Sequence, residues 1–485
     1  MAAVHDNDGA SRAARVRTVH AEATTFDNCV HILRALHQEL IPLPPLPGPA
    51  VASVPQTLEH EAKGIKRARF STLFYRPHAP NAERRERRGC TSCCSITETP
   101  AGTAAAAVTA APTASARVPL RVTVDEPCCG IGGTRSAVRY LNARKRARLT
   151  DDDDFVVVSA LDADERQAKT RLYNATAWRG ETLARSLRIE SAAAHAVARR
   201  VQPLLTVCGL PCWDLSVLGL GDGVLNGPTA AAFDGFFRRL GTTRSPLLII
   251  EEVDALLFSK HSASFRFITG KLQLLGYHWR VRVLNSAKLG AAQQRLRCYL
   301  VCARNAAVLA VFRWPTQTHK RRSSTFADAM LPVGVAPRTL FLNPATKVAR
   351  ALSRPSPAGL ARPPKNKDYS RVVSVFDMRV HVLSSARACV ATITASRSSG
   401  LYVWEGDALR RLAGVEALRF FTFSERETAE YAAAADALGI SSIELTEMAG
   451  DSFVVVVVAQ LMRALVDAFS AAASEEEKVL FKYDK

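Results

Sequence analysis

The sequence predicts an α/β protein with a doubly wound sheet and a second, smaller domain. β-rich runs such as RVTVDE, PLLTVCG and PLLIIEEV alternate with helix-like runs such as TRSAVRYLNARKRA and AAAFDGFFRRL as far as about residue 304. This alternation is typical of a sheet of parallel strands covered by helices. Beyond it the chain becomes basic and rich in Ser and Pro, which indicates a separate domain.

Composition divides the chain further. The N-terminal residues contain the basic clusters KGIKRARF and ERRERRG and a low-complexity Ala/Thr segment, so we expect them to be mostly disordered apart from one amphipathic helix in TTFDNCVHILRALHQEL. We expect an N-terminal extension over residues 1–117, an α/β domain over 118–304, a smaller basic domain over 305–400, a part with helical periodicity over 401–473, and an exposed tail over 474–485.

Charge and cysteine usage narrow the class of protein. The 485 residues carry a formal net charge of +19, which favours a polyanionic partner such as nucleic acid over a basic surface that binds nothing. The first twenty residues contain acids and no apolar core, so we expect an intracellular protein whose 11 cysteines are reduced. The basic clusters indicate the nucleus, with the cytoplasm as the alternative.

Neither a membrane span nor a metal site is expected. The longest apolar stretch, FVVVVVAQLMRALV, is too short to cross a bilayer and contains Arg463. The segment CTSCC, from Cys90 to Cys94, has one CxxC pair with no second pair nearby, so we do not expect it to bind zinc. Nothing in the sequence indicates an oligomeric state.

A glycine-rich turn follows the first predicted strand. Gly130, Gly132 and Gly133 lie between that strand and a helix, where glycine permits a tight turn and close approach to a ligand. The next strand ends at Asp162, and an acid in that position commonly bonds ribose hydroxyls. The two features favour a ligand that carries a nucleoside, against the alternatives of a simple strand–helix turn and a helix-capping acid.

Cys212 follows a strand and a Leu-Pro pair, and its role has three interpretations. It is a small buried hydrophobe, half of a metal site with Cys208, or a nucleophile at the carboxyl end of a parallel strand. No second pair of metal ligands follows. A nucleophilic thiol needs a lowered pKa, which nearby cations or a helix N-terminus supply.

Two later segments favour the nucleophile. The strand SPLLIIEEV ends in Glu251 and Glu252, and acids in this position are candidates for acid–base work. In QQRLR the alternate residues Gln293, Arg295 and Arg297 share one face if the segment is extended. Such a face beside a thiol and a carboxylate can hold a base or its phosphate.

In this order, the segments resemble the cytosine-5 DNA methyltransferase family over most of the chain beyond Val118. EPCCGIGG resembles the first family motif, LDADERQAKTRLYN the second, CGLPCWDLS the Pro-Cys motif and EEV the Glu-Asn-Val motif. QQRLR is similar to Gln-x-Arg-x-Arg, RRLAGVEALRFFTF to Arg-Leu-Thr-Pro-x-Glu at Arg411 and Glu416, and MAGDSFVVVVV to the closing Gly-Asn-Ser motif.

The resemblance implies a Rossmann-like domain that binds S-adenosyl-L-methionine and methylates carbon-5 of cytosine through a covalent adduct, without a metal. It implies these catalytic residues: Cys212, Glu251, Arg295 and Arg297. It implies these cofactor contacts: Glu126, Gly130, Gly132, Gly133, Asp162, Pro211 and Ser452. The target base has to leave the helical stack or be single-stranded, and the second domain then holds the phosphates through Lys320, Arg321, Arg322, Lys365 and Lys367.

The chain also departs from the family pattern. The departures are Cys128 for Phe, Leu210 for Pro, Trp213 for Gln, Glu252 for Asn, Ala292 for Pro and Asp451 for Asn. They leave open a homologue that binds nucleic acid without activity. The same chemistry on tRNA is a further alternative, although RACVATITASRSSG lacks the Cys-Phe-Thr segment of the tRNA-modifying branch. The sequence therefore predicts a DNA partner, with RNA as the alternative.

Overall fold

The computed structural model describes these residues: 119–147, 153–163, 167–216, 223–226, 229–316, 326–332, 334–343, 371–376, 379–384, 389–395, 401–405 and 408–479. The predicted N-terminal extension, with its helix and the cysteines of CTSCC, lies outside them. So do the predicted phosphate contacts Lys320, Arg321, Arg322, Lys365 and Lys367. The predictions for these segments stay predictions.

A seven-stranded sheet forms the centre of the larger part, which confirms the predicted α/β class. Its strands lie in the order β3-β2-β1-β4-β5-β8-β6. Six of them run in the same direction, and β8, between β5 and β6, runs in the opposite direction. The strands are β1 (Arg121–Pro127), β2 (Asp154–Asp162), β3 (Arg185–Ser186), β4 (Leu205–Gly209), β5 (Leu247–Val253), β6 (His278–Asn285) and β8 (Leu296–Ala303).

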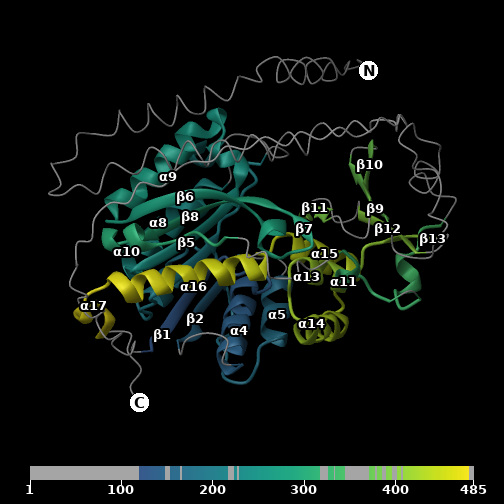
Figure 1. Ribbon diagram of the computed structural model, residues 1–485, viewed down its shortest axis with the longest axis horizontal. Coiled ribbons are helices and arrows are strands. Elements are labelled where there is room, and N and C mark those ends of the chain that lie inside the picture. Colours follow the sequence, from purple (N-terminus) through teal and green to yellow (C-terminus); the bar gives the residue numbers. More distant parts are fainter. Residues whose placement is uncertain are drawn as a thin grey trace, which may run out of the picture.

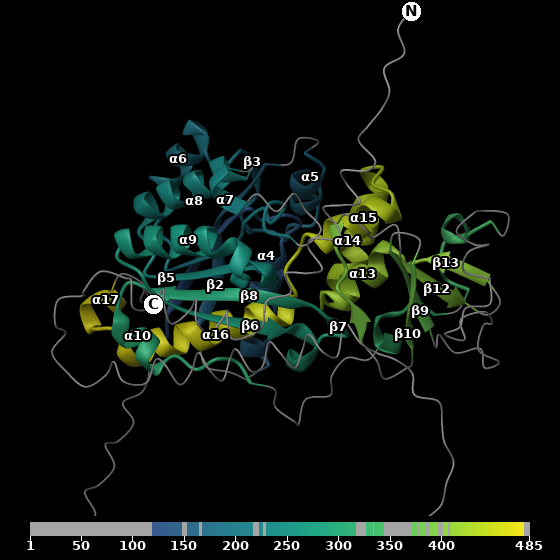
Figure 2. The same ribbon diagram turned by 90° about the horizontal axis from the view of Figure 1, so that it is seen from above.

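Helices cover both faces of this sheet (Figures 1 and 2), with α8 and α9 on one face and α16, packed against α4, on the other. The helices of this part are α4 (Gly133–Arg146), α5 (Ala168–Ala175), α6 (Ala192–Ala198), α7 (Gly223–Asn226), α8 (Ala230–Thr243), α9 (Ser262–Leu274), α10 (Ala306–Val311), α16 (Val455–Ala472) and α17 (Glu475–Val479). Short 3-10 turns occupy Asp254–Leu257, Ser259–His261 and Ser286–Leu289.

The central strands are apolar along their whole length because both of their faces are covered. In β5, Leu247 and Ile249 belong to the core under α16, whereas Leu248 and Ile250 belong to the core under α8 and α9. Successive side chains of a strand point to opposite faces. The two acids that end β5 therefore face opposite sides of the sheet, and this decides what each of them contacts.

A four-stranded antiparallel sheet, in the order β10-β9-β12-β13, lies beside the larger part (Figure 2). Its strands are β9 (Arg371–Phe376), β10 (Arg379–Ser384), β12 (Leu401–Glu405) and β13 (Ala408–Arg411). The helices near it are α11 (Phe326–Ala329), α13 (Gly414–Phe420), α14 (Glu425–Ala437) and α15 (Ser442–Gly450), with a 3-10 turn at Arg338–Leu340. The parallel pair of β7 (Gln293–Gln294) with β11 (Val390–Ala391) connects the two parts.

A buried ion pair stabilises the start of α13. Arg410 is fully buried and donates to both oxygens of Glu416, at 2.7 and 2.8 Å, and to Glu405 at 2.5 Å. The sequence comparison had aligned Arg411 with the family arginine of this segment. The partner of Glu416 is instead Arg410, one residue earlier, because Arg410 is fully buried against Glu416 whereas Arg411 is only half-buried.

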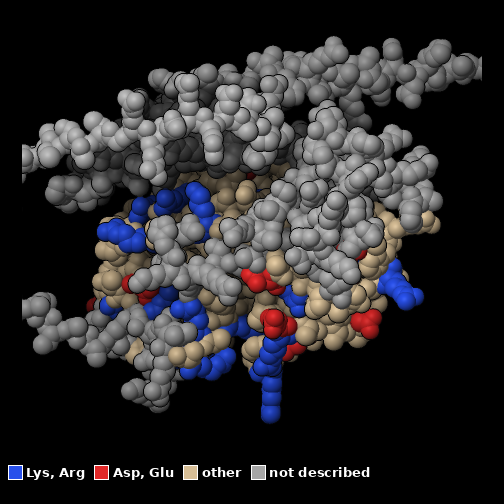
Figure 3. Space-filling model, turned by 45° about the vertical axis from the view of Figure 1, so that its right-hand side comes forward, with Lys and Arg blue, Asp and Glu red and all other residues tan. Residues whose placement is uncertain are grey.

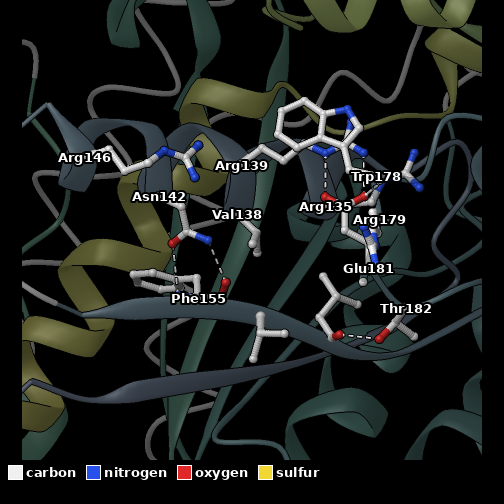
Figure 4. A pocket seen from close by; sticks show the side chains of 13 residues that line it. Arg135, Val138, Arg139, Asn142, Arg146, Phe155, Trp178, Arg179, Glu181 and Thr182 are labelled. Carbon is white, nitrogen blue, oxygen red and sulfur yellow. Dashed lines mark hydrogen bonds and ion pairs between the residues drawn. The ribbon is translucent and has the colours of Figure 1, made fainter. Parts of the chain in front are cut away.

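A pocket of about 190 Å³ lies between α4, β2 and the loop that follows α5 (Figure 4). Arg139 donates to Glu181 at 2.5 and 2.7 Å and lies 4.0 Å from the centre of the Trp178 ring. It also pairs with Glu427 of α14 at 3.3 Å. None of the predicted site residues lines this pocket, so its arginines serve to join α4, the loop and α14.

One segment among the described residues, Ser442–Ala472, is long and apolar enough to cross a membrane by length and composition. Of its most apolar window, 78% is buried inside the structure. It contains α15 and α16, and α16 packs against α4 and α10. Burial of this extent is typical of a core helix.

Arg239 of α8 offers a test of how the sheet is held together. Its guanidinium is 1% exposed and donates to both oxygens of the buried Asp125 of β1, at 2.6 and 2.8 Å. We expect Arg239→Ala to lower the free energy of unfolding by about 3–5 kcal/mol, because Asp125 is left as an unpaired buried charge.

Urea denaturation followed by circular dichroism measures this loss. Arg238→Ala is the matched control, because Arg238 is 54% exposed and pairs with Asp234 on the surface. A surface pair of this kind contributes at most about 1 kcal/mol. Equal effects of the two variants would contradict the assignment of the buried pair as a structural element.

Candidate active site

The predicted site residues meet at one edge of the seven-stranded sheet. The glycine turn follows β1, Asp162 ends β2, Cys212 follows β4, and Glu251 lies near the end of β5. The carboxyl ends of parallel strands share one edge, where open α/β sheets bind ligands. Because β8 runs in the opposite direction, its beginning lies at this same edge. Arg297 is its second residue, and Arg295 directly precedes the strand.

The glycine turn is shaped by left-handed backbone conformations. Gly130 and Gly132 have φ angles of 53° and 97°, which favour glycine. The amide of Gly130 donates to Asp162 Oδ2 at 2.7 Å, so the acid that ends β2 fixes the turn. A Cβ on Gly130 would meet no atom within 4 Å, so open space lies beside the turn. Gly133 instead packs against Ser452 and Phe453.

Glu126 lies under the glycine turn and is fully buried. One of its oxygens accepts from the amide of Thr134 at 3.0 Å and the other from the hydroxyl of Tyr173 at 3.3 Å. Burial raises the pKa of Glu126 to about 7, although the contacts with Thr134 and Arg135 act in the opposite direction. Glu126 therefore holds the N-terminus of α4 in place and carries a charge that depends on pH near neutrality.

The residues around the turn leave room for a ligand that carries a nucleoside. The open space beside Gly130 leaves room for a ligand, and Asp162 supplies a carboxylate at the edge of that space. The hydroxyl of Ser452 is buried without a hydrogen-bond partner in the described structure, so a polar group there is left for a ligand to satisfy. Pro211 is half-buried between β4 and Cys212.

Cys212 is half-buried and carries a thiol that belongs to no disulfide. Its carbonyl accepts from the amides of Leu215 and Ser216 at 3.1 and 2.8 Å, so the chain turns immediately after it. Burial raises the pKa of the thiol to about 12; Glu252 adds to this rise, and Arg297 opposes it. The resting thiol is therefore protonated at neutral pH.

Glu251 lies between two arginines of β8 and the segment before it. Its Oε1 is 3.1 Å from Arg297 Nε and 3.7 Å from Arg295 Nη2, as ion pairs rather than hydrogen bonds. All three side chains are nearly buried. The predicted alternation of Arg295 and Arg297 on one face is confirmed, and Glu251 shares that face because it continues the alternation of Leu247 and Ile249 in β5.

Arg295 and Gln293 join the two parts of the molecule. Arg295 donates to the carbonyls of Ile393 at 2.9 Å, Gly450 at 3.2 Å and Ser452 at 3.3 Å. Burial, followed by the charge of Arg297, lowers the pKa of Arg295 to about 10. Sequence reasoning assigned these side chains to a base or its phosphate and missed this connecting role, because the backbone partners lie 98 to 157 residues away.

Gln293 connects the same segments from the neighbouring position. It donates to the carbonyl of Phe420 at 3.0 Å and accepts from the amide of Ile393 at 3.3 Å. It is fully buried. Of the three alternating side chains, Arg297 alone has no hydrogen bond to the other part of the molecule among the contacts described. It forms an ion pair with Glu251, and its charge lowers the pKa of Cys212.

Glu252 points to the opposite face of β5 and is 1% exposed. Its Oε2 accepts from the amide of Val253 at 3.3 Å, and its Oε1 has no hydrogen-bond partner in the described structure. Burial raises its pKa well above the usual range, and Glu251 adds to the rise. The rise favours the neutral carboxyl, which can both donate and accept, as the amide of the expected Asn does.

Two further residues that differ from the family pattern, Cys128 and Asp451, lie at the glycine turn and on the surface. Cys128 has a φ of 62° at the start of the glycine turn and is half-buried. Asp451 forms an exposed ion pair with Lys169 at 2.8 Å.

No group of three or more His, Cys, Asp or Glu side chains in the described ranges is arranged to hold a metal ion.

The family model described as "C-5 cytosine-specific DNA methylase" matches residues 122–467. Among curated proteins, the chain is 30% identical to the type II methyltransferase M.SacI of Streptomyces achromogenes over 124 residues, which are 25% of this chain and 31% of that protein. It is 35% identical to the type II methyltransferase M.Sau3AI of Staphylococcus aureus over 101 residues, 20% of this chain and 24% of that one. The match thus spans less than a third of these relatives.

Solved structures of similar proteins include the methyltransferase EhMeth of Entamoeba histolytica. It has a TM-score of 0.49 and 17% identity, and the match covers 72% of this chain and 98% of that one. The Dnmt2 methyltransferase of S. pombe has a TM-score of 0.47 and 15% identity, with 72% and 98% covered.

The raised pKa of Cys212 predicts slow alkylation of the resting protein. Because the thiolate reacts and the pKa is about 12, the rate with iodoacetamide should rise about tenfold per pH unit throughout pH 7–9.5. In the urea-unfolded chain, where a thiol has a pKa of about 8.5, the rise should level off within this range.

Mass spectrometry of the peptide that contains Cys212 gives both rates. At pH 7 the folded protein should react at least about a hundredfold more slowly than the unfolded chain. Rapid modification of the folded protein at pH 7 would mean that Arg297 outweighs burial and that the thiolate already exists at rest.

Proposed function

Since this chain belongs to the family of C-5 cytosine-specific DNA methylases, we propose that it is a DNA (cytosine-5)-methyltransferase that uses S-adenosyl-L-methionine. The single observation that carries the proposal is the grouping of a thiol, a carboxylate and a guanidinium beside a glycine turn, at the ligand-binding edge of the sheet. These groups match the needs of the reaction.

Cys212 acts as the nucleophile in this proposal. Carbon-5 of cytosine is a poor nucleophile until a sulfur bonds to carbon-6, which makes carbon-5 electron-rich. The thiol proton passes to the carboxylate of Glu251 as the bond forms. Arg297 favours this loss, since its charge is the largest influence that lowers the pKa of Cys212. The reaction ends when a base removes the proton from carbon-5 and the sulfur leaves carbon-6.

Glu251 holds the opposite edge of the ring. Its Oε1 is buried and has ion pairs but no hydrogen bond, so it remains open to a donor of the base. There the carboxylate accepts a hydrogen bond from the exocyclic amino group, and it passes the proton released by Cys212 to the ring nitrogen at which charge develops. Arg297 and Arg295 keep the carboxylate in position from one side.

The cofactor contacts lie around the glycine turn. When bound, S-adenosylmethionine supplies an electrophilic methyl group to carbon-5. Asp162 is proposed to hold its ribose in the open space beside Gly130, with Ser452 supplying a hydroxyl. Glu126, Gly132 and Gly133 are proposed to act by shaping the turn, and the predicted contact of Pro211 stays a prediction. Cys128 replaces the family phenylalanine, so the adenine ring has a smaller apolar neighbour.

Substrate binding is proposed to depend on charge. The net charge of +19 favours a polyanion. On the face in Figure 3, Lys and Arg side chains lie in several groups among fewer Asp and Glu side chains. The proposed phosphate contacts at Lys320, Arg321, Arg322, Lys365 and Lys367 remain proposals. Each phosphate neutralised should add roughly −0.9 to the log–log slope of affinity against salt.

Methyl transfer and covalent trapping test the function together. We expect labelled methyl groups from S-adenosylmethionine to appear in duplex DNA and not in total tRNA. We expect a 5-fluorocytosine duplex to form an adduct that survives denaturation, because fluorine replaces the proton whose removal releases the sulfur. Scintillation counting and gel electrophoresis measure the two results.

Cys212→Ser and Cys298→Ser form the control pair for the adduct. Cys212→Ser should abolish the adduct, whereas Cys298→Ser should keep it because Cys298 is buried in β8. Label in tRNA alone would reject the DNA substrate. An adduct that persists in Cys212→Ser would reject the nucleophile.

The Glu251→Gln variant tests which of the two acids of β5 takes part in the reaction. The variant loses the carboxylate but keeps the size of the side chain, so we expect about 10²–10⁴-fold lower kcat with little change in S-adenosylmethionine binding. Single-turnover methyl transfer and equilibrium dialysis measure these quantities. Glu252→Gln is the control and should retain most activity, since burial favours the neutral carboxyl, which an amide resembles. The reverse pattern would transfer the role to Glu252.

A further inference from the structure

Trp213, the residue directly after Cys212, is an exposed aromatic side chain at the site. Its side chain is 66% exposed, whereas Asp214 and Leu215 after it are fully buried. Large aromatic side chains contribute to stability mainly by burial. The exposure of Trp213 therefore has no explanation in the packing of the protein itself, and the family residue at this position in the resemblance is Gln.

The backbone that carries Trp213 is held on both sides. The carbonyl of Cys212 accepts from the amides of Leu215 and Ser216 at 3.1 and 2.8 Å. Oδ2 of Asp214 accepts from both the amide and the hydroxyl of Thr229, at 3.0 and 2.6 Å. The indole is thus presented to solvent from a fixed turn, and a group held in this way loses less entropy when it binds a ligand.

The position of Trp213 determines what it can contact during the proposed reaction. Its Cα is about 3.8 Å from that of Cys212, as for any neighbouring residues. A nucleic acid whose cytosine bonds to Cys212 has to approach this turn from solvent, which is where the indole is exposed. Flipping the cytosine leaves a gap in the stack of bases, and aromatic or apolar side chains fill or widen such gaps in other DNA-binding proteins.

We propose that Trp213 stacks on the DNA bases left exposed when the target cytosine is flipped out, and so stabilises the flipped state. The proposal rests on the proposed function, because it requires duplex DNA at Cys212. Every base has an aromatic face, so the contact needs no particular neighbouring sequence. An Ala side chain cannot replace the indole, and Phe replaces it in part.

The test compares two DNA duplexes that differ in the cost of flipping. In the first, the target cytosine pairs with guanine; in the second, it lies opposite an abasic site, which makes it easier to extrude. For Trp213→Ala we expect kcat/KM for methyl transfer to fall about tenfold or more on the paired duplex and much less on the abasic duplex. Trp213→Phe should recover most of the loss.

Leu274→Ala is the matched control, since Leu274 is 83% exposed on α9 and lies away from the Cys212 turn in sequence and in fold. It should behave as the unchanged protein on both duplexes. A second measurement replaces the target base with 2-aminopurine. The fluorescence of 2-aminopurine rises when it is flipped out of the stack. The unchanged protein should increase it, and Trp213→Ala should increase it less at equal DNA occupancy.

Three outcomes would overturn the proposal: no loss in Trp213→Ala, an equal loss on both duplexes, or an unchanged 2-aminopurine signal. The first of these would leave the indole as a contact for another protein. If the unchanged protein transferred no methyl group to any DNA, the proposed function would fail, and the fluorescence comparison would still decide the role of Trp213.

Discussion

The carboxylate of Glu251, held between Arg295 and Arg297, is the interaction on which the site depends. It connects β5 to β8 at the sheet edge where the glycine turn and Cys212 also lie. A buried carboxylate needs compensating charge, because removing it from water is costly. The two arginines supply that charge and hold the carboxylate in place. Arg295 extends the connection to Ile393, Gly450 and Ser452 in the remainder of the chain.

This arrangement joins stability and chemistry in one network. The Nη1 and Nη2 atoms of Arg295 donate to backbone carbonyls of the second part. The position of the Glu251 carboxylate therefore depends on how that part packs against the larger one. Arg297 contacts Glu251 and lowers the pKa of Cys212 against the effect of burial. The proposed nucleophile thus rests as a neutral thiol. In the proposed function, its activation waits for a bound substrate, which limits side reactions of a thiolate with other electrophiles.

The departures from the family pattern have physical explanations that are compatible with activity. Glu252 replaces an asparagine, but burial raises the pKa of its carboxyl and favours the neutral form, which offers a donor and an acceptor as an amide does. Asp451 lies on the surface in an ion pair with Lys169. Trp213 differs from the others, since it adds an exposed aromatic surface where a polar side chain was expected.

The sequence by itself determined the α/β class, because β-rich apolar runs alternate with helix-like segments, as is typical of strands buried on both faces between covering helices. It also located Cys212, Glu251 and the glycine turn, since chemistry restricts the residue types at those places. Only the tertiary structure decided that β6 exists, that β8 is reversed, and that Arg410 rather than Arg411 pairs with Glu416. Strand direction and partner choice depend on contacts between residues far apart in the chain, and local patterns carry no record of those contacts.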